Sequence, residues 1–476
     1  MKKNLTLTIL LILTLNLYSQ SFQQFISYVN SIPENARQAK VDSFMNANSL
    51  LPFKESDTLC TFIYKGVVQN IKVAGDFTGW SPALSMTLVT GTDFWFFSTH
   101  FESDARLDYK YVINGSNWIL DPRNPYTCVG GYGPNSELRM PAYVVPPEIA
   151  YYSSIPHGTI RDTSFYSINL GNTRQVKIYL PPGYDVQKQY PVILFHDGPE
   201  YISLGNTNNI FDYLIYHQEI KPLIGIFVPP VDREAEYDGN KKDAFTAFIV
   251  AELMPVIDQR YSTSMDPHKR ATLGASSGGN IALYIGMKHP ESFGKIAAQS
   301  SNVETIISDT YQNGAKMDLE LYIDIGKYDI SGLIPLVINF IHILQNKNYV
   351  YQSKVWHEGH SWGNWKGHLS IALRQFFSPA AGFNENAVPA KINLYQNSPN
   401  PFKTHTRIDF NVPAGSNVEL TVYDSSGKRI QTLFKEMIFS EANSISFNNP
   451  DLADGIYFYS LRVDQFLVSK KMNISN

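Results

Sequence analysis

Residues 274–279 read Gly-Ala-Ser-Ser-Gly-Gly and contain the pattern Gly-x-Ser-x-Gly, with Ser276 at its centre. The segment before it, residues 270–273, is typical of a strand, and residues 280–288 are typical of a helix. In a strand–turn–helix of this kind, glycines allow a tight, strained turn that lifts the serine above the sheet edge. The helix N-terminus then stabilises a developing oxyanion. This context predicts that Ser276 is a nucleophile and that Ser277, the rival hydroxyl outside the central position, is not.

A serine hydroxyl needs a base to remove its proton, and imidazole, with an unperturbed pKa of about 6.5, suits that task near neutrality. A carboxylate orients the ring and stabilises the imidazolium. After such a turn the partners follow in the order Ser, acid, His, on loops beyond later strands. Asp329 follows the strand-like segment 319–325, and His360 follows segment 351–356. We therefore expect Asp329 as the acid and His360 as the base.

Three neighbouring residues are alternatives for these roles. His357 lies closer to its strand than His360 does, and Glu358 could replace Asp329. Asp324 belongs to the strand itself, so we expect its side chain to point into the sheet region.

An oxyanion hole requires two N–H donors. The N–H of Ser277, directly after the nucleophile, is one candidate. The second is expected from the loop after an early strand, where residues 194–199 read Leu-Phe-His-Asp-Gly-Pro. Pro199 has no N–H, so Gly198 is the predicted donor, with an ordinary turn as the alternative.

The elements around these residues alternate between apolar strands and amphipathic helices over residues 157–379. Such alternation predicts a mostly parallel sheet covered on both faces. Strands are expected at residues 191–195, 223–228, 271–273, 319–325 and 351–356, and helices at residues 244–257 and 333–344.

The segments on either side of this region have different residue patterns. Residues 21–55 have the three- and four-residue apolar spacing of amphipathic helices, interrupted at Pro33. Residues 56–140 and 392–476 contain short alternating segments and many turn residues, which indicate β-sandwiches. Proline-rich residues 141–156 are expected to be an extended linker, and residues 380–391 a second one. The predicted fold class is an α/β hydrolase catalytic domain flanked by two β-sandwich modules.

The first 20 residues combine a lysine pair with a short apolar stretch, which predicts a secretory signal peptide and no membrane span in the mature chain. In an oxidising compartment Cys60 and Cys128 could form a disulfide or remain two buried thiols. The formal net charge of −4 argues against a nucleic-acid partner. His and Cys residues are not arranged as ligands, so neither a metal nor a cofactor is expected.

Residues 160–378 resemble the esterase family that includes enterochelin esterases and feruloyl or acetyl xylan esterases. The resemblance is carried by residues 196–198, 228–233, 274–279, 326–329 and 359–365. It implies the triad Ser276, Asp329 and His360. It also implies, by position alone, a substrate pocket formed by Arg233, Tyr237, Trp362 and Trp365. The chain departs from its relatives at Ser361, where they often carry Asp after the histidine.

The two flanking modules carry resemblances of their own. Residues 56–140 resemble immunoglobulin-like modules of the starch- and glycogen-binding group, through residues 73–80 and 109–122. Trp80 and Trp118 could stack on sugar rings there, or belong to the packing of the module. Residues 392–476 resemble the C-terminal sorting domain of the Bacteroidetes type IX secretion system, through residues 395–402 and 455–457; the alternative is a further glycan-binding sandwich. The sorting domain implies export to the cell surface or medium.

The sequence thus predicts a secreted serine esterase that works through an acyl-enzyme. Its near-neutral charge favours an uncharged feruloyl or acetyl ester on a polysaccharide over an anionic siderophore trilactone. Acyl transfer to another alcohol is an alternative, because an acyl-enzyme does not select its acceptor by motif. An alternative of another class is a catalytically silent surface protein that binds glycan.

Overall fold

The computed structural model describes residues 21–379, 392–412, 416–424, 429–438, 442–448, 452–463 and 466–475. The predicted signal peptide and the predicted second linker lie outside these described residues. The chain forms two compact units, Met1–Pro379 and Ala380–Asn476.

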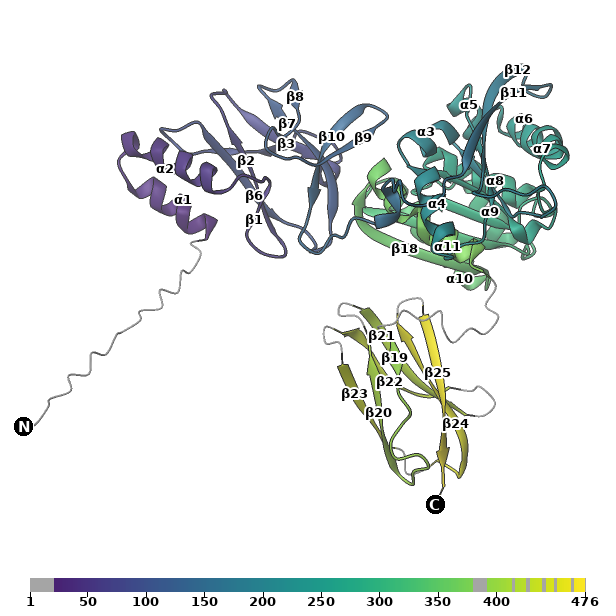
Figure 1. Cartoon of the computed structure of the whole chain (residues 1–476). Helices are drawn as coiled ribbons and strands as arrows, with labels where there is room; N and C mark the ends of the chain where they lie inside the picture. Colours follow the sequence, from purple (N-terminus) through teal and green to yellow (C-terminus); the bar gives the residue numbers. More distant parts are fainter. Residues whose placement is uncertain are drawn as a thin grey trace, which may run out of the picture. The chain divides into compact units, whose positions relative to one another are not determined.

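The larger part of the first unit is an α/β region built on a mostly parallel sheet (Figure 1). Its strand order is β11-β12-β14-β13-β15-β16-β17-β18, and every pairing from β14 to β18 is parallel. The strands are β11 (Thr159–Ser167), β12 (Asn172–Leu180), β13 (Val192–His196), β14 (Ile224–Val228), β15 (Arg270–Ala275), β16 (Lys295–Gln299), β17 (Glu320–Tyr328) and β18 (Val350–Gly359).

Apolar side chains on both faces of this sheet explain why its central strands are buried along their whole length. Alternate residues of β13 enter different clusters, Val192 and Leu194 on one face and Ile193 and Phe195 on the other. One face is covered by α6 (Lys242–Ala247), α7 (Met254–Arg260), α8 (Ser277–Lys288), α9 (Thr305–Asn313) and α10 (Leu333–Asn346). The other is covered by α3 (Gly198–Ser203), α4 (Thr207–Tyr216) and α11 (Trp362–Phe377).

The parallel, doubly covered sheet was predicted, but three of its strands were not: β11, β12 and β16. The helix expected at residues 244–257 is divided by a π-helical turn, Phe248–Leu253, between α6 and α7. The predicted linker 141–156 is not extended throughout, because a 3-10 turn, Pro147–Ile149, docks on α11. Glu148 is buried in that turn and Arg374 lies 3.3 Å from its carboxylate.

The N-terminal part of the first unit is a β-sandwich. One sheet has the order β1-β2-β6-β5, and the other is built around β7. The strands are β1 (Phe53–Lys54), β2 (Leu59–Lys65), β3 (Ile71–Gly75), β4 (Leu84–Ser85), β5 (Thr87–Leu88), β6 (Phe94–His100), β7 (Arg106–Ile113), β8 (Asn117–Ile119), β9 (Thr127–Gly130) and β10 (Gly133–Arg139). Cys60 and Cys128 are both buried free thiols in this sandwich, so the disulfide alternative is not realised.

Two helices precede the sandwich, α1 (Phe22–Ser31) and α2 (Glu34–Ala47), and Pro33 separates them as predicted. The Ser21 hydroxyl caps α1 by accepting the Gln24 N–H, and the Gln24 side-chain oxygen accepts the Ser21 N–H. Both helices bury aromatic and aliphatic side chains against β6, including Phe22 against Phe94.

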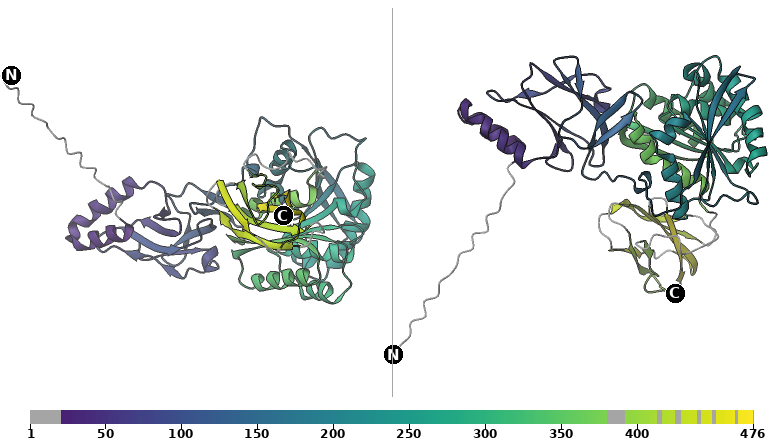
Figure 2. Two further views of the ribbon diagram at one scale, coloured as in Figure 1. Left: turned by 90° about the horizontal axis from the view of Figure 1, so that it is seen from below. Right: turned by 45° about the horizontal axis from the view of Figure 1, so that its top comes forward.

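The sandwich and the α/β region share one continuous sheet. Strand β18, the last parallel strand, pairs with β7 of the sandwich through Glu358 and Arg106. Figure 2 shows the two parts of this unit from two further directions. This junction lies beside the loop that carries His360.

The second unit is a separate β-sandwich of two antiparallel sheets, β19-β20-β23 and β22-β21-β24-β25. Its strands are β19 (Asn393–Leu394), β20 (His405–Asn411), β21 (Ser416–Asp424), β22 (Arg429–Ile438), β23 (Ala442–Asn448), β24 (Gly455–Val463) and β25 (Phe466–Ile474). Alternating residues such as Ile408, Phe410, Tyr459 and Leu461 form its core.

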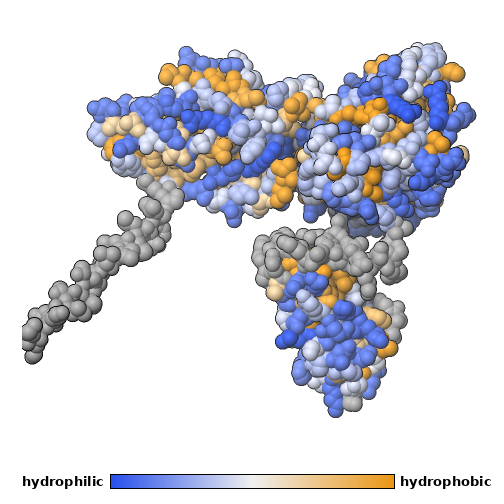
Figure 3. Space-filling view, viewed as in Figure 1, coloured by the Kyte–Doolittle hydropathy of each residue, from blue (hydrophilic) through white to orange (hydrophobic). Residues whose placement is uncertain are grey.

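None of the helices in the described part of the chain has the length and apolarity needed to cross a lipid bilayer. On the face of the molecule seen in Figure 3, apolar side chains form several separate patches among polar ones.

Candidate active site

Ser276 occupies a strained turn between β15 and α8. Its backbone angles are φ 55° and ψ −128°, a region that residues other than glycine rarely adopt. Gly274 makes the turn possible, because a Cβ at that position would overlap the backbone of Gly278. The Ser276 N–H donates to the Gln299 carbonyl at 2.8 Å, which ties the turn to β16. The predicted strand–turn–helix is therefore present, with the hydroxyl at its apex.

Asp329 lies directly after β17 with its side chain fully buried. Its Oδ1 is 2.7 Å from His360 Nδ1 and accepts the Ile330 N–H at 2.8 Å. Its Oδ2 accepts the Ser300 hydroxyl at 2.7 Å and the Gly326 N–H at 3.3 Å. Hydrogen bonds from several donors fix the orientation of this carboxyl group.

His360 lies on the loop between β18 and α11, with 19% of its side chain exposed. Its ring meets Trp365 edge to face, with 5.0 Å between the ring centroids. Because Nδ1 faces Asp329, Nε2 is the nitrogen left to act on another group. No hydrogen bond joins His360 to the Ser276 hydroxyl in the described residues, but both side chains line one cleft.

The alternatives for acid and base lie elsewhere. His357 pairs with the exposed Asp104 at 2.6 Å and does not line the cleft. Glu358 is buried and pairs with His368 at 2.7 Å. Asp324 is buried in the sheet, as expected, where it accepts the Tyr322 hydroxyl at 2.9 Å.

The two predicted oxyanion donors lie at the starts of neighbouring helices. Gly198 begins α3 and Ser277 begins α8, and neither N–H donates to an acceptor in the described chain. The loop that precedes Gly198 contacts the start of α8, because a Cβ on Gly278 would lie 3.0 Å from Asp197 Oδ2. Gly198 itself has no room for a side chain against the backbone of Phe227.

The cleft above Ser276 has a volume of about 1050 Å³ and draws its walls from both parts of the first unit. Carboxylates outnumber basic groups along it: Asp76, Asp108, Asp197, Glu200 and Asp329 face only Lys110 and Arg233. Three aromatic residues of the sandwich line it, Trp80, Trp118 and Tyr132, and of these Trp118 is 42% exposed and Tyr132 completely exposed.

Three of the four predicted pocket residues line this cleft: Arg233, Trp362 and Trp365. The Arg233 guanidinium forms a two-point ion pair with Asp197. Its Nε donates to Asp197 Oδ1 at 2.8 Å and its Nη2 donates to Asp197 Oδ2 at 2.8 Å. It joins the segment after β14 to the loop that follows β13.

The structure contradicts the prediction that Tyr237 is a pocket residue, because Tyr237 does not line the cleft. It is fully buried, its ring packs on Phe245, and its hydroxyl accepts the Asp197 N–H at 3.0 Å. Helix α5 (Arg233–Tyr237) turns it toward the core, and position in a motif does not determine side-chain direction.

Sequence reasoning missed Ser300, which follows the unpredicted strand β16. Ser300 donates to Asp329 and accepts the Trp365 indole N–H at 3.1 Å, so it links the acid to the cleft wall. Its backbone has φ 48°. Recognition of β16 would have placed Ser300 at the same sheet edge as Asp329.

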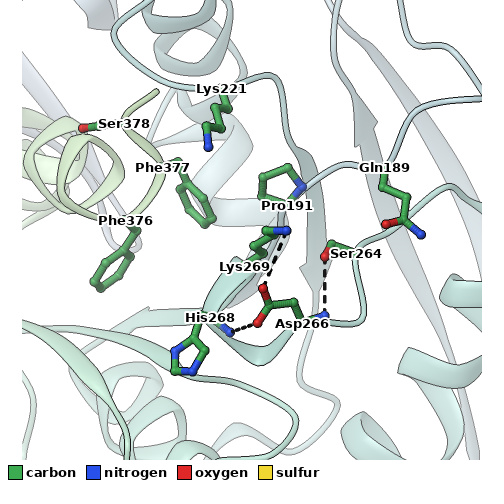
Figure 4. Close-up of a pocket in the computed structure, with 10 residues that line it drawn as sticks. All are labelled: Gln189, Pro191, Lys221, Ser264, Asp266, His268, Lys269, Phe376, Phe377 and Ser378. Atoms are coloured by element: carbon green, nitrogen blue, oxygen red, sulfur yellow. Dashed lines mark hydrogen bonds and ion pairs between the residues drawn. The ribbon is translucent and has the colours of Figure 1, made fainter. Parts of the chain in front are cut away.

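A smaller pocket of about 380 Å³ lies at the opposite edge of the sheet, where β13 and β15 begin. Figure 4 shows its lining, in which Asp266 accepts the His268 N–H and pairs with Lys269 at 3.6 Å. It holds no serine–histidine–carboxylate arrangement. Within the described residues, no group of three or more His, Cys, Asp or Glu side chains is placed to hold a metal ion.

Two parts of the chain match known families. Residues 167–376 match the family described as "Putative esterase", and residues 397–475 match the "Secretion system C-terminal sorting domain". The first unit therefore contains an esterase-family domain, and the second is a sorting domain. The sorting domain indicates export, with the protein secreted or at the cell surface.

Individual relatives agree with the esterase match. The chain is 30% identical over 158 residues to an endo-1,4-beta-xylanase/feruloyl esterase of Xylanibacter ruminicola, covering 30% of this chain but only 22% of that protein. It is 23% identical over 339 residues to an iron(III) enterobactin esterase of Escherichia coli O6:H1, covering 63% of this chain and 83% of that protein. The solved enterobactin esterase of Shigella flexneri superposes with a TM-score of 0.60 at 20% identity, covering 70% of this chain and 97% of that one. At that identity, the superposition establishes a shared fold.

Proposed function

We propose that this protein is an exported serine esterase that hydrolyses carboxylic esters through an acyl-enzyme. The observation that carries the proposal is the strained Ser276 turn, which opens onto the same cleft as a histidine paired with a buried, hydrogen-bonded aspartate. The family match supports ester chemistry at this site.

In the first half-reaction His360 Nε2 removes the proton of Ser276 as the hydroxyl oxygen attacks the ester carbonyl. Asp329 stabilises the imidazolium that forms. The tetrahedral oxyanion accepts hydrogen bonds from the N–H groups of Ser277 and Gly198, for which the described residues supply no other acceptor. The alcohol then leaves with the proton from His360, and the acyl group stays on Ser276.

In the second half-reaction His360 activates a water molecule, which attacks the acyl carbonyl. The carboxylic acid leaves and the Ser276 hydroxyl regains its proton. Transfer to a second alcohol would follow the same course with that alcohol in place of water.

The cleft favours an uncharged ester over an anionic trilactone. Its lining has more carboxylates than basic groups, and its arginine is held by Asp197. The exposed rings of Trp118 and Tyr132 present apolar surfaces that suit a sugar or phenolic ring. We therefore propose feruloyl or acetyl esters of polysaccharide as the substrates, in line with the feruloyl esterase among the relatives.

A serine-directed fluorophosphonate probe tests the nucleophile. The wild-type protein should be labelled, Ser276→Ala should not, and Ser308→Ala on α9 is the matched control that should label normally. Labelling of Ser276→Ala at the wild-type rate would show that Ser276 is not the nucleophile. Lack of hydrolysis of any short aryl ester by the wild type would favour a silent glycan-binding protein.

A panel of feruloyl, acetyl and trilactone esters then tests the substrate class. We expect a higher kcat/KM for the feruloyl or acetyl members. A preference for the trilactone would overturn the substrate assignment while leaving the esterase mechanism intact.

A further inference from the structure

The loop that carries His360 leaves the last parallel strand of the α/β sheet. Strand β18 has β17 on one side, and on its other side it meets the N-terminal sandwich at the Glu358–Arg106 pairing. The position of the loop therefore depends on a module that contributes none of the proposed triad.

Arg106 is the central residue of this contact, with only 1% of its side chain exposed. Within the sandwich it lies 2.6 Å from Asp108 and 3.3 Å from Glu137. Across the junction its Nη1 donates to the Ser361 hydroxyl at 3.0 Å and lies 3.6 Å from Glu358. Glu358 and Ser361 lie two residues before and one residue after His360, so one guanidinium holds the loop on both sides of the imidazole.

Two glycines that flank the loop, Gly359 at the end of β18 and Gly363 in α11, fit closely against the sandwich. A Cβ at Gly359 would overlap the Asp76 carboxyl group, and a Cβ at Gly363 would overlap the Arg106 guanidinium. Both contacts leave no space for a side chain, which indicates that the loop is shaped to the module and not merely adjacent to it.

The loop that carries Asp329 is held by the same stretch of the sandwich. Glu102 accepts the Tyr328 hydroxyl at 2.8 Å and pairs with Lys327. Phe101 packs edge to face on Tyr328, with 6.1 Å between the ring centroids. Tyr328 is the residue immediately before Asp329, so the acid is held from the same side as the base.

We propose that residues 102–106, which we call the clamp segment, position the acid and base of the site, with Arg106 acting through Ser361 and Glu358. The inference rests on the proposed function, in which His360 is the base. Arg106 is a positioning residue, since it touches the loop and not the reacting atoms. The residue directly after His360 is Ser361, and its partner is an arginine of another module.

The test compares Arg106→Lys, Ser361→Ala and the double variant in the full chain. Arg106→Lys keeps the charge but loses the planar fork. Ser361→Ala removes the hydroxyl that accepts from Arg106 and that also caps α11 by accepting the Asn364 N–H at 3.4 Å, while it leaves every carboxylate pair of Arg106 intact. We expect each to lower kcat about 10- to 100-fold with little change in KM, because small misplacements of a reacting group act on the chemical step. The double variant should lose little more than the worse single one.

Arg139→Lys is the matched control. Arg139 lies 2.7 Å from the same Glu137 carboxylate but does not contact the His360 loop, so this variant should keep the wild-type kcat. Thermal unfolding of each variant measures the folded fraction. A kcat that stays at the wild-type value in folded Ser361→Ala and Arg106→Lys, or that falls equally in Arg139→Lys, would overturn the proposal.

A readout without turnover separates this proposal from the proposed function. In protein labelled with ¹⁵N-histidine, the His360 Nδ1–H resonance, assigned by its loss in His360→Gln, reports the bond to Asp329. It should move in Arg106→Lys and Ser361→Ala and stay in place in Arg139→Lys. A His360 resonance that does not move in Arg106→Lys and Ser361→Ala would refute the proposed role of the clamp segment. A wild-type protein without esterase activity, in which the resonance still moves as expected in the two variants, would refute only the esterase assignment.

Discussion

Replacing Asp324 by asparagine should change how the stability of the first unit depends on pH. Asp324 is completely buried in strand β17. Its Oδ2 accepts hydrogen bonds from Tyr322 at 2.9 Å and from the Trp356 indole at 3.4 Å, whereas Oδ1 has no partner among the described residues. Burial disfavours the ionised carboxylate and raises its pKa from 3.8 to about 6, although the neighbouring His368 and the hydrogen-bond donors act in the opposite direction.

The sign follows from proton binding. Between pH 3.8 and about 6 the folded protein holds a proton on Asp324 that the unfolded chain has released, so rising pH favours unfolding. The contribution is fully present below the unfolded pKa and is lost as the pH rises through the folded pKa. A difference of about two pH units, at about 1.4 kcal/mol per unit, corresponds to about 3 kcal/mol. Asp324→Asn cannot ionise and should not show this loss.

Urea unfolding of the full chain, followed by tryptophan fluorescence between pH 4 and pH 8, measures the effect. The free energy of unfolding of Asp324→Asn, relative to the wild type, should increase by up to about 3 kcal/mol across this range. Asp318→Asn, whose side chain is 91% exposed, controls for the loss of an acidic group. A wild type and an Asp324→Asn variant with parallel pH dependences would refute the reasoning.

Three further outcomes follow from single contacts. Ser300→Ala removes a donor to Asp329 and should lower kcat about 10- to 100-fold with KM little changed, measured with an aryl ester. Tyr237→Phe leaves the buried Asp197 N–H without an acceptor and should lower the free energy of unfolding by about 1–3 kcal/mol in a urea titration. Burial raises the pKa of Glu102, but hydrogen bonds from Lys327 and Tyr328 lower it to about 2. The contribution of Glu102 to the free energy of unfolding is therefore present above pH 4.5 and is lost as the pH falls toward 2. Glu102→Gln should therefore show a weaker loss of stability between pH 5 and pH 2.5 than the wild type in the same titration.

The sequence predicted the chain positions of the proposed triad because those positions depend on backbone chemistry. Glycines at 274 and 278 allow the tight turn between strand and helix, and residues directly after parallel strands meet at one sheet edge. Asp329 and His360 could be located by this rule and are 2.7 Å apart in the structure. Ser276 shares their cleft, although its role as nucleophile stays a proposal.

Side-chain direction and contacts between distant segments could not be predicted. Tyr237 occurs in a motif shared with relatives, yet a short helix turns it into the core. Ser300 was missed because the strand before it, β16, reads Lys-Ile-Ala-Ala-Gln and contains only one of the β-branched or aromatic residues that are typical of strands. Arg106 could not be singled out from the sequence, because its partner Ser361 lies 255 positions away in the chain.

The separation of Arg106 and Ser361 by 255 positions has a consequence for the order in which the protein assembles. Domains generally fold as units, N-terminal first, while the chain is still being made. The sandwich can be complete long before the residues after β18 exist. The base of the proposed site therefore reaches its final position late, by docking onto a surface that was formed first, and a chain that ends before residue 360 carries the proposed nucleophile without its base.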